Sequence, residues 1–145
     1  MTTHPVSMPM TDELRALVAA YADAAPPRPS GGDAIVACDL DRTLVYSAKA
    51  LALAGADADA PVLLVAEVYD KLPLSYLTVD AVALVQEMHR VATFVPSTTR
   101  TRAQYERIRL PIDPQYAVTT NGGFLLVDGV SDEDYHRAVL DELDG

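Results

Sequence analysis

A short apolar run that ends in carboxylates constrains the fold of this chain more than any other feature. Residues 34–38 read Ala-Ile-Val-Ala-Cys, and Asp39 follows directly. Runs of this kind are typical of central strands in a parallel sheet, which are buried on both faces. Because open α/β sheets bind ligands beyond the carboxyl ends of their strands, the run predicts a central strand that delivers Asp39 to a ligand.

Two further apolar segments, residues 92–95 and 116–119, are predicted to be strands of the same sheet. Before them, residues 62–78 favour an irregular hairpin, and Thr78 is placed to cap a helix. A short polar helix is expected over residues 102–109. This order of strands and helices predicts an α/β fold, a Rossmann-like parallel sheet with flanking helices.

The acidic composition limits the expected partners. The formal net charge is -10 and the sequence pI is about 4.5. Such a surface repels phosphate backbones and anionic lipids, so we expect neither a nucleic acid nor a membrane as partner. No apolar stretch approaches the roughly 20 residues that span a bilayer, and no secretory signal pattern is present. A cytoplasmic protein is therefore expected, with Cys38 as a core thiol and His4, His89 and His136 as surface residues.

The segment Asp39-Leu40-Asp41-Arg42-Thr43 carries two carboxylates that leave a strand tip together. One carboxylate could attack phosphorus as a nucleophile. The other could serve as general acid and then as general base. Because carboxylates and phosphate repel each other, Mg²⁺ would be needed to bridge them. The alternative is an aspartate-rich turn or a helix cap without chemistry.

Residues 35–44 resemble the first motif of the haloacid dehalogenase (HAD) superfamily. The resemblance implies that Asp39 is the nucleophile and that Asp41 is the acid/base. It also implies that both residues hold Mg²⁺, Asp41 through its backbone carbonyl, and that Thr43 holds the loop. Arg42 stands where that family commonly has glycine.

Two later segments resemble further motifs of the same superfamily, in its branch with a large inserted cap. Residues 94–101 resemble the second motif, which implies that Thr98 binds a phosphoryl oxygen and that Arg100 is a bidentate phosphate partner. Residues 116–123 resemble a strand that ends in Asn-Gly, so Asn121 would contact the site. A helix N-cap within residues 97–101 and a turn role for Asn121 remain the alternatives.

The resemblance also divides the chain. Residues 1–32 are expected to form an N-terminal helix and a linker rich in proline and glycine, and residues 33–127 the first part of a HAD-like core. Residues 128–145 would form a C-terminal helix or the start of the cap, with a capping box that begins at Ser131. The cap and the later core strands, with their lysine and acidic pair, are not found in this sequence.

The function expected from the resemblance is a Mg²⁺-dependent phosphatase of small phosphorylated metabolites, with sugar phosphates as the favoured class. It would act through an aspartyl-phosphate. The alternatives are a phosphomutase of the same superfamily and a non-catalytic chain that depends on a partner. Because the lysine and the acidic pair are missing, this chain is expected to be inactive alone. It is also expected to be oligomeric or completed by another chain.

Overall fold

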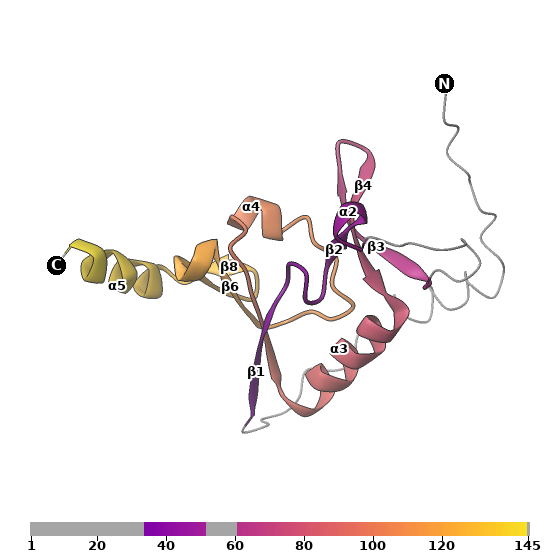
Figure 1. Cartoon of the computed structure of the whole chain (residues 1–145). Coiled ribbons are helices and arrows are strands. Elements are labelled where there is room, and N and C mark those ends of the chain that lie inside the picture. The colour runs from indigo at the N-terminus through magenta and orange to yellow at the C-terminus, as the bar shows by residue number, and fades with distance from the viewer. Residues whose placement is uncertain (1–33, 52–60, 145) are drawn as a thin grey trace.

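The computed structural model describes residues 34–51 and 61–144 (Figure 1). The helix and linker expected over residues 1–32 lie outside the described residues. None of the described helices is both long and apolar enough to cross a bilayer.

The larger sheet mixes parallel and antiparallel strands in the order β1-β5-β6-β7-β8. Its strands are β1 (Ile35–Asp39), β5 (Thr93–Ser97), β6 (Tyr116–Thr119), β7 (Phe124–Val127) and β8 (Val130–Ser131). Strands β1, β5 and β6 run parallel to one another, whereas β7 pairs antiparallel with β6 and β8 pairs antiparallel with β7. The α/β class is thus confirmed at this level: a mixed sheet with flanking helices.

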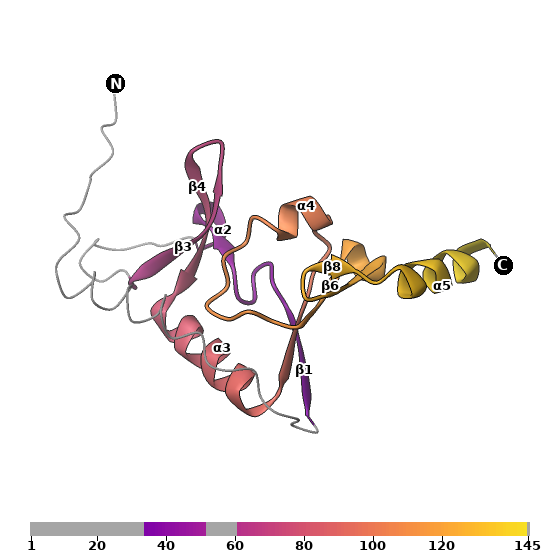
Figure 2. The ribbon, with the colours of Figure 1, turned by 180° about the vertical axis from the view of Figure 1, so that it is seen from behind.

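A second sheet has three antiparallel strands in the order β2-β4-β3. They are β2 (Tyr46–Ser47), β3 (Leu63–Tyr69) and β4 (Leu72–Thr78), with the short helix α2 (Ala48–Leu51) after β2. Strands β3 and β4 form the hairpin that was predicted over residues 62–78, and its tip stands away from the larger sheet (Figures 1 and 2).

Helix α3 (Val79–Val91) begins where the sequence predicts it. The hydroxyl oxygen of Thr78 accepts a hydrogen bond from the backbone N–H of Ala81 at 3.1 Å. Three or four residues separate Val82, Val85 and His89, so they share the buried face of the helix. The prediction of a surface position was wrong for His89, which is only 3% exposed because it lies on this face.

One hydrophobic core joins α3, both sheets and the loop after β1. Its fully or nearly buried members are Leu40, Leu44, Val45, Ala66, Leu77, Val82, Val85, Phe94, Ile108 and Ile112. The core fixes the segments that lead into and out of the tip of β1.

Strand β1 is an edge strand among the described residues, where a central strand was predicted. It pairs with β5 alone, and its burial alternates along the strand. Val36 and Cys38 pack against the core, whereas Ile35 is 72% exposed on the other face. An apolar run shows that a strand can be buried on both faces, but its neighbours decide whether it is.

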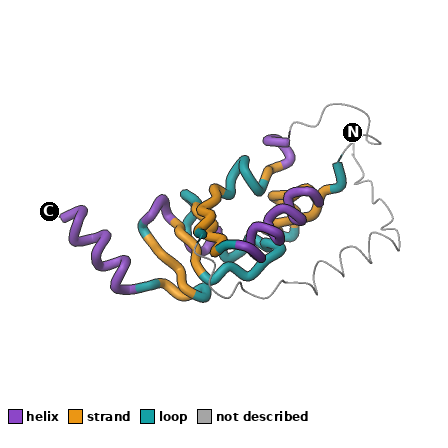
Figure 3. Tube along the Cα trace, turned by 90° about the horizontal axis from the view of Figure 1, so that it is seen from below, coloured by secondary structure: helices purple, strands orange, loops and turns teal. Residues whose placement is uncertain are grey.

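One helix is shorter than expected, and another begins with a different capping residue. Helix α4 (Arg102–Tyr105) ends early, because Ile108 leaves the helix to form a β-bridge with Glu67. Helix α5 (Glu133–Asp144) forms as predicted, but Asp132 caps it, since its carboxylate accepts from the N–H of Tyr135 at 2.9 Å. Ser131 instead belongs to β8. Beyond its first turn, α5 extends away from the sheets (Figure 3).

Candidate functional site

The loop after β1 is a tight turn held by one carbonyl. The backbone N–H groups of Thr43, Leu44 and Val45 all donate to the carbonyl of Leu40, at 2.8 to 3.3 Å. Leu40 is fully buried and anchors the turn in the core. Arg42 takes a φ of 64°, in the left-handed region that favours glycine. The loop therefore curls back on the strand even though an arginine occupies the turn position.

Asp39 ends β1 with an exposed side chain, and the Thr43 hydroxyl donates to its Oδ2 at 3.2 Å. Its carboxylate borders a cavity of about 280 Å³ at the carboxyl ends of the three parallel strands. The other lining residues are Ser97, Thr98, Thr99, Val118, Asn121 and Gly122. Residues that carry hydroxyl and amide groups therefore line the cavity together with Asp39.

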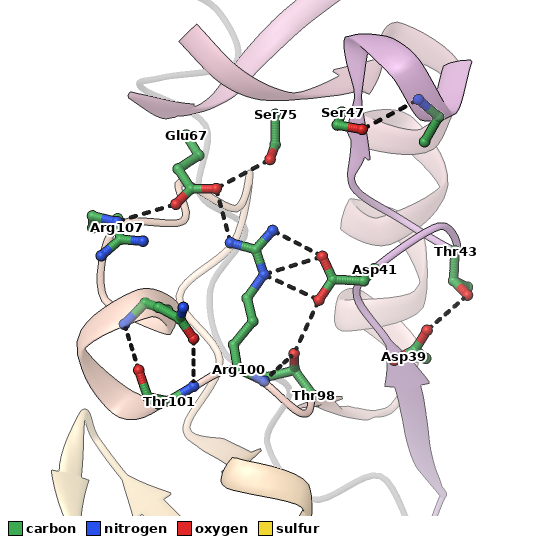
Figure 4. Close-up of polar contacts among 12 residues, drawn as sticks. Asp39, Asp41, Thr43, Ser47, Glu67, Ser75, Thr98, Arg100, Thr101 and Arg107 are labelled. Atoms are coloured by element: carbon green, nitrogen blue, oxygen red, sulfur yellow. Dashed lines mark hydrogen bonds and ion pairs between the residues drawn. The ribbon is translucent and has the colours of Figure 1, made fainter. Parts of the chain in front are cut away.

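Asp41 lies beside this cavity and is held by two donors (Figure 4). The Thr98 hydroxyl donates to Asp41 Oδ2 at 3.3 Å. The guanidinium of Arg100 donates through Nε at 3.0 and 3.1 Å and through Nη2 at 2.8 Å. These hydrogen bonds from Arg100 hold the pKa of Asp41 below its usual value, against the opposing effect of burial. The Asp41 side chain is therefore a paired carboxylate in this arrangement.

Glu67 is the functional candidate that the sequence analysis missed. It is completely buried, and it accepts from Arg100 Nη1 at 2.8 Å, Arg107 Nε at 3.1 Å and the Ser75 hydroxyl at 3.0 Å. Burial by itself would raise the pKa of Glu67, but the hydrogen bonds from Arg100 and Arg107 outweigh it and hold the pKa below its usual value. A signal existed, because Glu67 is the one charged residue within the strand Leu-Leu-Val-Ala-Glu-Val-Tyr.

The turn after β6 closes the cavity with an unusual backbone. Thr120 and Asn121 both have a φ of 55°, and Gly122 has a φ of 91°. A β-branched residue such as Thr120 rarely adopts a positive φ, and backbone strain of this kind gathers at ligand sites. The N–H of Asn121 donates to the carbonyl of Thr98 at 3.1 Å, and that of Thr120 to the carbonyl of Arg100 at 2.8 Å. The turn is thus fastened to the loop after β5.

The predicted site residues fall into two adjacent groups. Asp39, Thr98 and Asn121 line the cavity. Asp41 and Arg100 pair with each other beside it, and the Thr98 hydroxyl touches Asp41, so Thr98 belongs to both groups. Thr43 braces Asp39 from the outside of the turn. Arg100, expected to face a phosphate, contacts two carboxylates and is not among the cavity-lining residues.

The oxygen atoms at this edge suit Mg²⁺. Within residues 34–51 and 61–144 no three His, Cys, Asp or Glu side chains form a metal-binding group. Mg²⁺, however, is commonly bound by one or two protein oxygens, with water and substrate phosphate completing its shell. The exposed carboxylate of Asp39 and the backbone carbonyl of Asp41 are donors of that kind. The residues present therefore fit the ion that the HAD resemblance implies.

Comparison of the sequence with models of known protein families gave no match, and comparison with curated proteins gave none either. The likeness of residues 35–44, 94–101 and 116–123 to the HAD motifs therefore stays a resemblance. What this site can do follows from the chemistry of its own residues.

Proposed function

We propose that this chain belongs to a Mg²⁺-dependent phosphatase of small phosphorylated metabolites, in which Asp39 forms an aspartyl-phosphate. One observation carries the proposal. The exposed carboxylate of Asp39 shares a cavity with Thr98 and Asn121, at the common edge of three parallel strands. Sugar phosphates are the favoured substrate class, by the resemblance alone.

Asp39 is the nucleophile in this proposal. Its carboxylate oxygen forms a bond to phosphorus while the bond from phosphorus to the leaving oxygen breaks. The hydrogen bond from Thr43 keeps one carboxylate oxygen oriented. The side-chain amide of Asn121 offers a donor to the phosphoryl oxygens, and the Thr98 hydroxyl would offer a second once it turns from Asp41. Bound Mg²⁺, held by the Asp39 carboxylate and the Asp41 carbonyl, would supply the positive charge that lets an anionic phosphate approach.

Asp41 exchanges the protons of the reaction. Its lowered pKa keeps Asp41 deprotonated, which the base role requires when Asp41 takes a proton from the water that hydrolyses the aspartyl-phosphate. The acid role requires a protonated Asp41, which the ion pair with Arg100 disfavours. Arg100 must therefore shift from Asp41 before Asp41 can protonate a leaving group. A phosphoryl group is a suitable competitor, because it accepts the same two parallel N–H bonds as a carboxylate.

Arg100 is also the cation placed to balance the charge of the site. The chain has two lysines, Lys49 in α2 and Lys71 in the turn between β3 and β4, and neither lines the cavity. Arg137 lies in α5 and pairs with Asp134 at 3.0 Å. Phosphoryl transfer depends strongly on fixed positive charge, so the position of Arg100 is central to the proposal.

The test is to trap the aspartyl-phosphate analogue that beryllium fluoride forms with a reactive carboxylate. We expect a bound ¹⁹F resonance that requires Mg²⁺ and disappears in Asp39→Asn. Asp80→Asn, which makes the same change at an exposed position in the first turn of α3, should keep the signal. Equal trapping by Asp39→Asn, or no trapping by the unmodified chain, would overturn the proposal in favour of the non-catalytic alternative.

A further inference from the structure

We propose that Glu67 is a positioning residue for phosphate binding, which fixes Arg100 beside the cavity and so couples the β3–β4 hairpin to the site. The effect on phosphate binding rests on the proposed function, whereas the contact between Glu67 and Arg100 does not. Glu67 touches neither the cavity nor Asp41; it acts through Arg100.

An irregularity in the backbone of β3 orients the side chain of Glu67 toward Arg100. The pairing of β3 with β4 is irregular on both sides of Glu67, with register shifts between Val65 and Glu67 and between Glu67 and Val68. Such bulges re-aim a side chain and are common next to active sites. Glu67 also bridges to Ile108, which closes the strand against the segment after α4. Its carboxylate is thus inside the protein with its direction fixed.

The guanidinium of Arg100 is held from two sides. Its Nε and Nη2 donate to Asp41, and its Nη1 donates to Glu67 at 2.8 Å. Only 17% of the Arg100 side chain is exposed. An arginine has five N–H donors, so after these three atoms are engaged a fixed guanidinium still has N–H groups to offer an anion. When a phosphate displaces Asp41 from Nε and Nη2, Glu67 still holds the guanidinium through Nη1, so the phosphate would not have to order a free side chain first.

The contacts form a continuous chain between the two sheets. The Ser75 hydroxyl in β4 donates to Glu67 Oε2 at 3.0 Å, Glu67 holds Arg100, and Arg100 holds Asp41. The Thr98 hydroxyl, at the cavity, donates to Asp41. Figure 4 shows this path running from the hairpin to the tip of β1. A change at Ser75 therefore reaches the phosphate site through Glu67.

Positioning and simple electrostatics predict opposite signs. A carboxylate near an anion site repels the anion, so a purely electrostatic Glu67 would make phosphate bind more tightly once it was removed. A positioning Glu67 would make phosphate bind more weakly after removal, because Arg100 would lose its fixed direction. Ser75→Ala separates the two effects further, since it changes no charge.

The experiment measures two quantities in the whole chain. The first is the affinity for inorganic phosphate with Mg²⁺ present, by isothermal titration. The second is the Nε–H resonance of Arg100 in the ¹⁵N–¹H spectrum, assigned by its loss in Arg100→Gln. In the unmodified chain we expect a protected Nε–H, because Nε donates to Asp41. Glu67→Ala should weaken phosphate binding about tenfold, which is the lower end of the range for residues that orient a directly contacting side chain. Ser75→Ala should weaken it less, and both should reduce the protection of the Nε–H.

Glu87→Ala is the matched control, because it removes a carboxylate that pairs with Arg90 on the exposed face of α3. It should change neither quantity. If phosphate binds equally or more tightly to Glu67→Ala, or if the Arg100 resonance is unchanged in Glu67→Ala and Ser75→Ala, the positioning role is overturned. If Glu67→Ala does not fold, Ser75→Ala decides in the same way. Failure of the unmodified chain to bind phosphate would overturn the proposed function, and the Arg100 resonance would still decide whether Glu67 positions Arg100.

Discussion

Replacing Glu67 by alanine should destabilise the chain strongly. Removing one partner of a buried ion pair costs about 3–5 kcal/mol, because the remaining charge is left unpaired. Here the loss is smaller, since Arg100 keeps Asp41 and the Arg100 and Arg107 side chains are 17% and 31% exposed to water. We therefore expect a loss of about 2–3 kcal/mol, which corresponds to a fall in Tm of about 10 °C for a chain of this size. Thermal and urea unfolding followed by circular dichroism at neutral pH would measure both.

Glu87→Ala tests the reasoning behind that magnitude. The Glu87–Arg90 pair is shorter, 2.6 Å against 2.8 Å for Glu67–Arg100, but its two side chains are 60% and 61% exposed. If burial governs the stability of an ion pair, Glu87→Ala should leave the unfolding midpoint unchanged despite the shorter distance. Equal losses in the two variants, or no loss in Glu67→Ala, would refute the buried network as a source of stability.

Three further predictions concern pH, the loop and activity. The pKa of Glu67 is lower in the folded chain than its usual 4.5, so its stabilising effect is full above that value and disappears as the pH falls through the folded pKa. In urea unfolding, the free energy of unfolding should therefore fall less steeply with decreasing pH in Glu67→Ala than in the unmodified chain. Arg42→Gly should raise the unfolding free energy by roughly 0.5–1 kcal/mol, because relief of the positive φ exceeds the entropy that glycine adds to the unfolded chain. Any loss of stability in this variant would contradict that balance. The chain as printed should hydrolyse a chromogenic phosphate ester weakly or not at all with Mg²⁺, because no lysine lines the cavity. Robust Mg²⁺-dependent turnover that Asp39→Asn abolishes would show instead that Arg100 suffices.

Local patterns in the sequence predicted the elements that carry the site. The apolar runs at residues 34–38, 92–95 and 116–119 became β1, β5 and β6, and Thr78 caps α3. These elements follow from short-range physics, namely burial of apolar runs and satisfaction of helix N–H groups. Thr98 lies next to the Asp39–Asp41 loop, because parallel strands bring their carboxyl ends to one edge.

Long-range pairing could not be predicted in the same way. Glu67 meets Arg100 across 33 residues, and Asp41 meets the same guanidinium across 59. The local sequence does not show that Arg100 pairs with two carboxylates, whereas Arg102 lies over the ring of Phe124. His89 was likewise placed on the surface, because its burial depends on what α3 packs against.

The sequence by itself determined which residues stand at the tips of the strands: Asp39 at the end of β1, Asp41 after it, and Thr98 after β5. Backbone geometry sends the residue after a strand to the sheet edge, whatever the rest of the chain does. Only the tertiary structure decided that β1 is an edge strand among the described residues and that Asp41 is paired with Arg100. The charge partners of a side chain depend on which distant segments share its surroundings, and the hydrogen bonds and charges of those partners control its pKa and its role.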